Sequence, residues 1–302
     1  MLKALITGAS GFLGSYINYF AKKTVITCAT FWNHPPVNEK EQWFRLDLTN
    51  YAGLDQFLNK IRPDVILHLA AITDIDQCQL DKESAKSVNI EATKCLVNYA
   101  ATKRKRMIFI SSDMVFDGKK GMYREEDAVA PVSFYGETKA IAEEIVRSHC
   151  SNWVNVRAAL IYGKPLGGGS SFTEWMRRGL ENGKQVFLYS DQYRTPIFVE
   201  NLARIIIELI DHSFIGDMHC GGANRIDRFS FGKQFCKFGH YDPNLLVPTL
   251  IKQSKAAATR PVDVSLDISK AKSILKTRLL STEEGLLQMF AGRKKQETEE
   301  LL

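Results

Sequence analysis

The feature that most constrains the fold is an alternation of short apolar runs with amphipathic stretches in the first half of the chain. Apolar runs of this length predict strands, and the stretches between them predict helices. Runs such as residues 65–69 and 107–110 are continuously apolar, which is typical of strands buried on both faces of a parallel sheet. The predicted strands cover residues 3–7, 24–30, 43–46, 64–69, 106–111 and 153–157, and the predicted helices cover 12–22, 51–61, 83–102 and 134–149.

Strands separated by helices form βαβ units, whose right-handed connections wind into a doubly wound parallel sheet of the Rossmann type. After about residue 158 the chain changes to glycine- and proline-rich turns with shorter strands and helices. We therefore predict an α/β fold with a first domain over residues 1–160 and a smaller α/β domain over most of 161–302. A segment near residues 195–220 is predicted to return to the first domain.

Charge and cysteine content exclude several classes of protein. Forty Lys and Arg residues against 34 Asp and Glu residues leave a net charge of +6, without an arginine-rich arm. This excess suits anionic small molecules, and we expect no nucleic-acid partner. No apolar run reaches the roughly 18 residues of a membrane span, and no signal peptide is expected. Six scattered cysteines without metal-binding spacing predict reduced thiols in a cytoplasmic protein and no metal site.

A glycine-rich loop directly follows the first predicted strand and opens the first helix. Gly8, Gly11 and Gly14 stand in a G-x-x-G-x-x-G pattern. The first glycine permits a tight turn, the second lets backbone approach a pyrophosphate, and the third lets the helix pack against the strand. The helix N-terminus then offers free N–H groups to the phosphates. The first domain is therefore predicted to bind a dinucleotide.

The end of the second predicted strand bears on the choice of dinucleotide. An NAD site places an acidic residue there to bind the ribose hydroxyls, but residues 28–34 contain none. This favours NADP(H) over NAD(H), with Asn33 and His34 as candidate contacts, although the same stretch supplies no arginine. Asp47, just after the third strand, has two readings: it accepts a hydrogen bond from the adenine amino group, or it caps the next helix.

The pattern Y-x-x-x-K occurs three times, at Tyr19/Lys23, Tyr99/Lys103 and Tyr135/Lys139. Only Tyr135 begins a helix, and it comes 23 residues after Ser112, at the carboxyl end of the fifth predicted strand. Ligands of open α/β sheets bind outside those carboxyl ends. We therefore expect the third pair, together with Ser112, to form the reactive site.

The chemistry explains the spacing of this pair. Residues four apart on a helix share one face, with Cβ atoms roughly 5–6 Å apart. A free tyrosine has a pKa near ~10, and we expect the Lys139 ammonium to lower the pKa of Tyr135 while also holding the nicotinamide ribose. Ser112 is expected to hydrogen-bond a substrate carbonyl, and Tyr135 is expected to deliver the proton after hydride transfer.

Several motifs together resemble the extended short-chain dehydrogenase/reductase family, over roughly residues 1–275. They are residues 7–14, 68–71, Asn89, 111–113, Tyr135/Lys139 and 161–163. Within that family, residues 110–118 and 260–267 look most similar to the dTDP-4-dehydrorhamnose reductase branch. The resemblance implies NAD(P)H-dependent reduction of the 4-keto group of a nucleotide-linked deoxysugar, and a possible homodimer by analogy.

The resemblance also implies which residues bind each ligand. Substrate-binding residues would be Thr73, Ser112 and Arg194, and catalytic residues would be Ser112, Tyr135 and Lys139. The cofactor-binding residues would be Gly8, Ser10, Gly11, Phe12, Leu13, Gly14, Asp47, Leu48, Leu69, Ala70, Ala71, Tyr135 and Lys139.

Departures from the family pattern leave the substrate open. Leu160 stands where the rhamnose reductases carry a tryptophan, and Arg194 stands where they carry a small residue. Arg194 has two readings: it grips a substrate phosphate, or it is a surface salt-bridge partner. Dehydratases of the family use an Asp-Glu pair after the catalytic hydroxyl. The chain has Asp113 followed by Met114, which cannot exchange a proton, so dehydration is disfavoured.

Two alternatives to a reductase remain. Sugar-nucleotide epimerases of the family keep the same Ser, Tyr and Lys set. The regulatory β subunit of methionine adenosyltransferase resembles the same branch, including a stretch like residues 123–127, and it is an NADP-binding partner protein rather than a catalyst.

Overall fold

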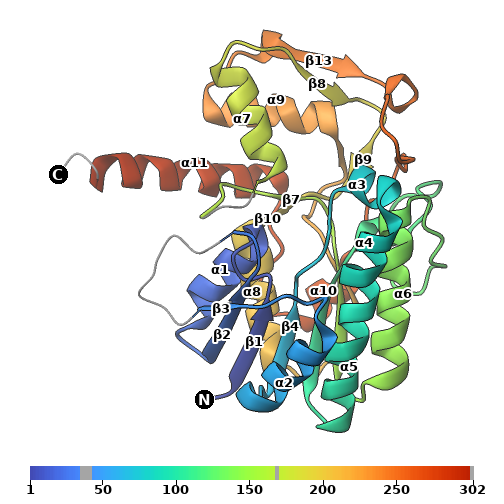
Figure 1. Ribbon diagram of the computed structural model, residues 1–302. Coiled ribbons are helices and arrows are strands. Elements are labelled where there is room, and N and C mark those ends of the chain that lie inside the picture. Colours follow the sequence, from blue (N-terminus) through green and yellow to red (C-terminus); the bar gives the residue numbers. More distant parts are fainter. Residues whose placement is uncertain (35–42, 167–169, 300–302) are drawn as a thin grey trace.

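Seven parallel strands form the central sheet, in the order β11-β6-β5-β4-β1-β2-β3 (Figure 1). The computed structural model describes residues 1–34, 43–166 and 170–299, the last eight of these as backbone only. The order runs outward in both directions from β1 and β4, as in a doubly wound sheet. The strands are β1 (Lys3–Thr7), β2 (Ile26–Phe31), β3 (Trp43–Arg45), β4 (Val65–His68), β5 (Arg106–Ser112), β6 (Trp153–Ala158) and β11 (Gly216–Cys220).

Both faces of this sheet are buried, as the continuous apolar runs predict. Leu5 and Ile6 are neighbours in β1, point to opposite faces and are both fully buried, in different apolar cores. One core contains residues of α1 and α8, and the other contains residues of α2, α5 and α6. These helices are α1 (Phe12–Ala21), α2 (Tyr51–Ile61), α5 (Ala92–Thr102), α6 (Phe134–His149) and α8 (Val199–Ile210). The predicted Rossmann-type fold is therefore confirmed.

The rest of the chain forms a smaller layer above the carboxyl ends of the strands (Figure 1). It holds three two-stranded pairs: β7 with β10, β9 with β12, and β8 with β13. Their strands are β7 (Ile161–Tyr162), β8 (Val186–Tyr189), β9 (Tyr193–Arg194), β10 (Ile197–Phe198), β12 (Ile226–Asp227) and β13 (Leu246–Thr249). The helices of this layer are α7 (Phe172–Glu181), α9 (Arg228–Gly239) and α11 (Thr282–Glu299), which projects from the body. Helix α10 (Ser269–Ile274) instead packs against β11 of the central sheet.

The chain leaves the central sheet after β6 and comes back to it through α8 and β11. Helix α8 packs beside α1, and β11 pairs with β6 from Gly216 to Cys220. The region near residues 195–220 therefore contributes an edge strand and a covering helix to the sheet. The domain boundary near residue 160 stays a prediction.

The helix predicted over residues 83–102 is confirmed, since residues 82–102 are helical without a break, but it contains a π-helical turn that was not predicted. The chain forms α3 (Ile75–Leu80), α4 (Lys82–Lys86), a π-helical turn η1 (Ser87–Glu91), and only then α5. Within that turn the buried Asn89 accepts a hydrogen bond from Ile72 N–H and donates to the Ile72 carbonyl and to Thr138 Oγ1. The wider turn directs the Asn89 amide toward the loop after β4. The pattern of apolar residues in the sequence does not predict such a contact.

A buried ion pair fastens α6 to the sheet. Glu143 of α6 and Arg157 of β6 are each about 1% exposed in their side chains. Arg157 Nε donates to Glu143 Oε1 at 3.0 Å, and its Nη2 donates to Oε2 at 2.8 Å. This forked pairing holds α6, which carries Tyr135 and Lys139, in a fixed place against β6.

Candidate functional site

One cavity of about 1610 Å³ lies at the carboxyl ends of the central strands, between the sheet and the smaller layer. A pocket for one small ligand has a volume of roughly 300–1,000 Å³, so this cavity has room for two ligands. Every residue that the sequence predicts as part of the site lines it. They are Gly8, Ser10, Gly11, Phe12, Leu13, Gly14, Asp47, Leu48, Leu69, Ala70, Ala71, Thr73, Ser112, Tyr135, Lys139 and Arg194.

The glycine loop lies at one end of the cavity, where the strand order reverses between β1 and β4. Gly8 has φ +67°, and a Cβ there would stand 2.9 Å from Ala70 Cα. A Cβ on Gly14 would lie 2.2 Å from the Gly8 carbonyl oxygen, so the turn closes only with glycine at both positions. Gly11 is the N-cap of α1 and offers no side chain to its first N–H groups. The loop thus fits an anionic pyrophosphate.

A buried hydrogen-bond chain joins this loop to the one after β4. Thr7 Oγ1 accepts from the backbone N–H groups of Leu69 and Ala70, at 3.2 and 3.3 Å. His68 contacts Thr7 Oγ1 at 2.7 Å and Thr93 Oγ1 at 2.9 Å. Burial lowers the pKa of His68 to about 3, so its imidazole is neutral and positions the loops.

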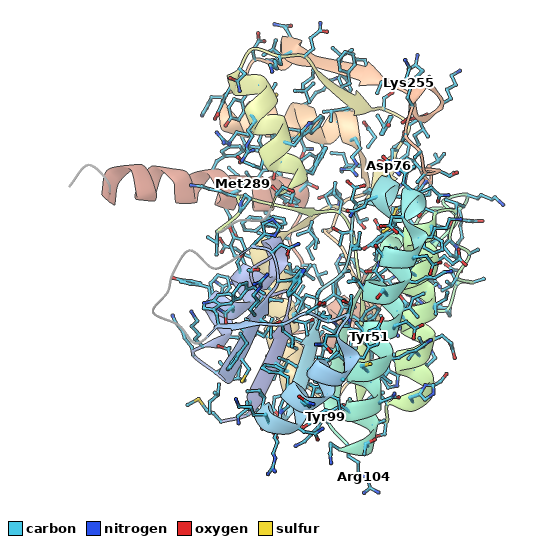
Figure 2. All side chains as sticks on the ribbon, viewed as in Figure 1. Tyr51, Asp76, Tyr99, Arg104, Lys255 and Met289 are labelled. Atoms are coloured by element: carbon cyan, nitrogen blue, oxygen red, sulfur yellow. The ribbon has the colours of Figure 1, made fainter. Side chains whose placement is uncertain are left out.

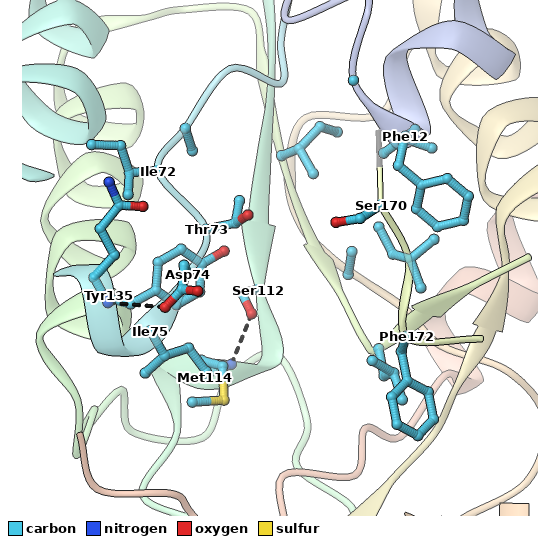
Figure 3. A pocket seen from close by; sticks show the side chains of 18 of the residues that line it. Phe12, Ile72, Thr73, Asp74, Ile75, Ser112, Met114, Tyr135, Ser170 and Phe172 are labelled. Carbon is cyan, nitrogen blue, oxygen red and sulfur yellow. Dashed lines mark hydrogen bonds between the residues drawn. The ribbon is translucent and has the colours of Figure 1, made fainter. Parts of the chain in front are cut away.

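Ser112 and Tyr135 meet on one wall of the cavity, opposite Phe12, Ser170 and Phe172 (Figure 3). Ser112 Oγ donates to Asp113 Oδ1 at 3.1 Å and accepts from Met114 N–H at 3.2 Å, and its hydroxyl faces the Tyr135 side chain. Tyr135 stands in the first turn of α6, which packs closely on the turn after Ser112. The predicted convergence of these two residues is present in the structure.

The pKa of Tyr135 is raised rather than lowered as expected, and Lys139 is not among the groups that shift it. Burial raises the pKa of Tyr135, and the neighbouring Ser112 hydroxyl only partly offsets this. Lys139 Nζ lies 4.0 Å from the centre of the Phe109 ring, and burial lowers its pKa to about 7. A lysine that is half neutral near pH 7 exerts only a partial field on the phenol. The phenol therefore keeps its proton, as a proton donor must.

The two other Y-x-x-x-K pairs lie away from the cavity. Tyr19 is 63% exposed on α1. Tyr99 ends α5 at the opposite end of the sheet from the pocket (Figure 2). Neither lines the cavity, so the topology selects Tyr135 as the sequence argument expects.

Arg194 is not a surface salt-bridge partner. Its side chain is 4% exposed, and Nε lies 3.5 Å from Asp113 Oδ2, directly beside Ser112. Burial raises the pKa of Asp113, while the Arg194 charge opposes that shift. The guanidinium thus stands next to the reacting groups, with Nη1 donating to the Tyr193 carbonyl and Nη2 to Met114 Sδ.

Two further arginines, which the sequence analysis did not single out, line the same side of the cavity. Arg228 lies over the Phe172 ring at 4.4 Å and donates to Gln192 Oε1 at 3.1 Å. Burial and then the charge of Arg194 lower the pKa of Arg228 to about 9, and Arg260 adds to the shift. Such crowding of cations favours an anionic ligand.

An ion pair joins α3 to the segment that carries Arg260, beside the cavity. Asp76 accepts from Arg260 Nη2 at 2.7 Å and from Ala258 N–H at 2.9 Å. Thr73 comes just before α3 and lines the cavity beside it. The two sides of the pocket are therefore tied together.

Asp47 does not cap the following helix. Asn50 does so, because its Oδ1 accepts from Gly53 N–H. Asp47 Oδ1 instead accepts from Thr49 N–H at 2.8 Å and from Thr49 Oγ1 at 2.6 Å, which fixes a turn at the cavity wall. The adenine-binding reading of Asp47 stays a prediction.

Arg45 is a cation near the end of β2 that the sequence does not show directly. Residues 28–34 contain no arginine, but β3 pairs in parallel with β2 and sets Arg45 opposite Phe31. Its guanidinium carbon lies 4.7 Å from the centre of the Trp32 ring. The sequence feature that could have indicated this residue is a basic side chain near the end of the third predicted strand, residues 43–46.

A doubly wound sheet, a phosphate-accepting glycine loop and a Ser-Tyr-Lys set in one cavity define an extended short-chain dehydrogenase/reductase. Residues 2–294 match the family described as RmlD substrate binding domain. The chain therefore belongs to the RmlD substrate binding domain family, which confirms the expected branch.

Relatives from several organisms are similar over nearly the whole chain. The probable low-salt glycan biosynthesis reductase Agl14 of Haloferax volcanii is 28% identical, covering 96% of this chain and 97% of its own. The methionine adenosyltransferase 2 subunit beta of Pongo abelii is 25% identical, with 90% of this chain and 82% of its own covered. The structure of dTDP-4-dehydrorhamnose reductase from Bacillus anthracis in complex with NADP has a TM-score of 0.86, at 26% identity, covering 96% and 99%.

Two kinds of feature are absent from the described residues. None of the helices within the described ranges has the length and apolar character needed to cross a bilayer. The same residues contain no group of three or more His, Cys, Asp and Glu side chains able to hold a metal ion.

Proposed function

We propose that this protein reduces the 4-keto group of a nucleotide-linked deoxysugar, with a reduced nicotinamide dinucleotide as the electron donor. The observation that carries the proposal is the meeting of Ser112, Tyr135 and the glycine loop in one cavity with room for two ligands. A relative in the same family is named a dTDP-4-dehydrorhamnose reductase and has a structure in complex with NADP.

The dinucleotide would lie along the glycine loop, with its pyrophosphate at the N-terminus of α1. Gly8 and Gly14 let the turn close on itself, Gly11 leaves the backbone open to such a ligand, and Leu69 to Ala71 form the facing wall. When bound, the reduced nicotinamide supplies a hydride to the substrate carbonyl carbon. We propose NADPH as the preferred form, because residues 28–34 contain no carboxylate to repel a 2′-phosphate.

The chain's own residues would handle the proton. Tyr135, protonated because burial raises its pKa, donates to the carbonyl oxygen as negative charge develops there. Ser112 orients that oxygen, and Asp113 in turn orients the Ser112 hydroxyl. Lys139, four residues after Tyr135 on the same face of α6, holds the nicotinamide ribose and supplies positive charge when protonated.

The other half of the cavity suits a nucleoside diphosphate. Arg194, Arg228 and Arg260 give it clustered positive charge, which a diphosphate would neutralise. Phe172 and Trp175, stacked 6.0 Å apart, line the same half and offer a flat surface for a base. A nucleotide-linked sugar would thus reach from these groups to Ser112.

The test is a spectrophotometric assay with the purified protein, NADPH and a panel of 4-keto-6-deoxy sugar nucleotides. We expect NADPH absorbance to fall with at least one sugar, and the product to carry a new hydroxyl at that carbon. Tyr135→Phe, run in parallel, should stop the reaction. A change at a stereocentre without net consumption of NADPH would indicate an epimerase instead.

A regulatory role is the second candidate, because the methionine adenosyltransferase subunit beta is similar over 90% of this chain. Retained Tyr and Lys residues do not distinguish the two roles. Tight NADP binding, no turnover with any sugar in the panel, and co-purification of a catalytic partner would favour it over the reductase.

A further inference from the structure

The end of β2 and the end of β3 form a small recess beside the cofactor end of the main cavity. Trp32, Leu46 and Asp47 line both spaces, and Arg45 lines the recess. In a Rossmann-type fold the end of the second strand is where the adenosine ribose lies. Whatever occupies the 2′ position of that ribose would therefore face Trp32 and Arg45.

The sheet register, rather than the local sequence, brings a cation to this place. Strand β3 pairs in parallel with β2, and Arg45 is the partner of Phe31, the residue just before Trp32. The guanidinium carbon lies 4.7 Å from the centre of the Trp32 ring. Stacking on an aromatic face holds a guanidinium in place and leaves its N–H edges free for an acceptor.

The surroundings favour an anion there. Arg45 is exposed, and Trp32 is 46% exposed, so a ligand reaches both. No described residue accepts a hydrogen bond from the Arg45 guanidinium. The carboxylate that shares the recess, Asp47, has its Oδ1 engaged by Thr49 N–H and Thr49 Oγ1. A phosphate monoester would meet a guanidinium that forms no ion pair with a described carboxylate, since Asp47 turns its Oδ1 to Thr49 rather than to Arg45.

We propose that Arg45, stacked on Trp32, binds the 2′-phosphate of NADP(H) and determines the preference for it over NAD(H). The inference rests on the proposed function only in requiring that the glycine loop bind a dinucleotide. The proposal gives β3 the positive charge that the loop after β2 does not supply. Arginine suits the role better than lysine, because its planar fork donates two hydrogen bonds to one phosphate.

The experiment is isothermal titration calorimetry of the full chain with NADP⁺ and, separately, with NAD⁺. Arg45→Ala should weaken NADP⁺ binding about 10- to 100-fold, the range for losing a hydrogen bond to a charged group. Its affinity for NAD⁺ should stay within about twofold, since that ligand lacks the phosphate. Arg45→Lys should fall between, and Arg104→Ala, an exposed arginine at the far end of the sheet (Figure 2), should match the unmodified protein.

The outcomes separate the two proposals. Equal weakening of both dinucleotides would mean that Arg45 packs against the adenine or merely supports Trp32, and would overturn the inference. Unchanged NADP⁺ affinity in Arg45→Ala would overturn it as well, while leaving the reductase proposal in place. Binding of neither dinucleotide by the unmodified protein would refute the cofactor site itself.

Discussion

The buried pair between Glu143 and Arg157 allows a sharp prediction about stability. In Glu143→Gln the carboxylate becomes a neutral amide of nearly the same shape, so the change removes charge and leaves packing almost intact. Arg157, about 1% exposed, then keeps its charge without its main counterion. Breaking one partner of a buried pair costs roughly 3–5 kcal/mol.

The neighbouring groups place the cost at the lower end of that range. Asp217 Oδ2 lies 3.5 Å from Arg157 Nη2, and the Glu125 carbonyl accepts from Nη1 at 3.2 Å. We therefore expect about 3 kcal/mol. At roughly 2 °C per kcal/mol for a chain of this size, Tm should fall by about 6 °C.

Thermal unfolding followed by circular dichroism, with urea unfolding at constant temperature, measures this loss. The matched control is Glu144→Gln on the same helix, since Glu144 is 61% exposed and pairs with Arg147 at the surface. Exposed pairs contribute about 0.2–1 kcal/mol, so the control should lower Tm by no more than about 2 °C. Equal losses in the two variants would show that burial does not decide the strength of the pair.

Three further predictions concern the site. Tyr135→Phe should lower kcat about 10²- to 10⁴-fold and leave NADP⁺ affinity within about twofold, because it removes only the proton donor; steady-state kinetics and calorimetry check both values. Gly11→Val should weaken dinucleotide binding at least about tenfold, because the valine side chain would stand between the loop and the pyrophosphate. Unchanged affinity in a binding titration would place the phosphates elsewhere. Lys139 has a pKa of about 7 in the folded protein, below its ordinary value, so above pH 7 the unfolded chain binds more protons than the folded one. The free energy of unfolding should therefore rise with pH between pH 7 and about 10. Lys139→Met should flatten that rise, which the midpoints of urea unfolding measure.

The parts of the fold that follow from local pattern could be predicted. Continuous apolar strands give a sheet buried on both faces, and three glycines after the first strand give the phosphate loop. The site could be predicted as far as topology brings strand ends together, which is why Ser112 and Tyr135 meet although 23 residues separate them.

What could not be predicted depends on partners far along the chain. The π-helical turn exists because Asn89 reaches Ile72 and Thr138, and apolar periodicity does not register such a bond. The recess at Arg45 depends on the register of two strands. The pKa of Tyr135 was predicted to fall because a nearby cation was considered and burial was not.

The excursion of the chain out of the sheet and back has a consequence for how new specificities could arise in this scaffold. Replacing everything after β6 in one exchange would also remove α8 and β11, and would strip the sheet of an edge and part of its cover. A recombinant that accepts another sugar therefore needs junctions on both sides of residues 197–220, or must remodel the intervening loops in place.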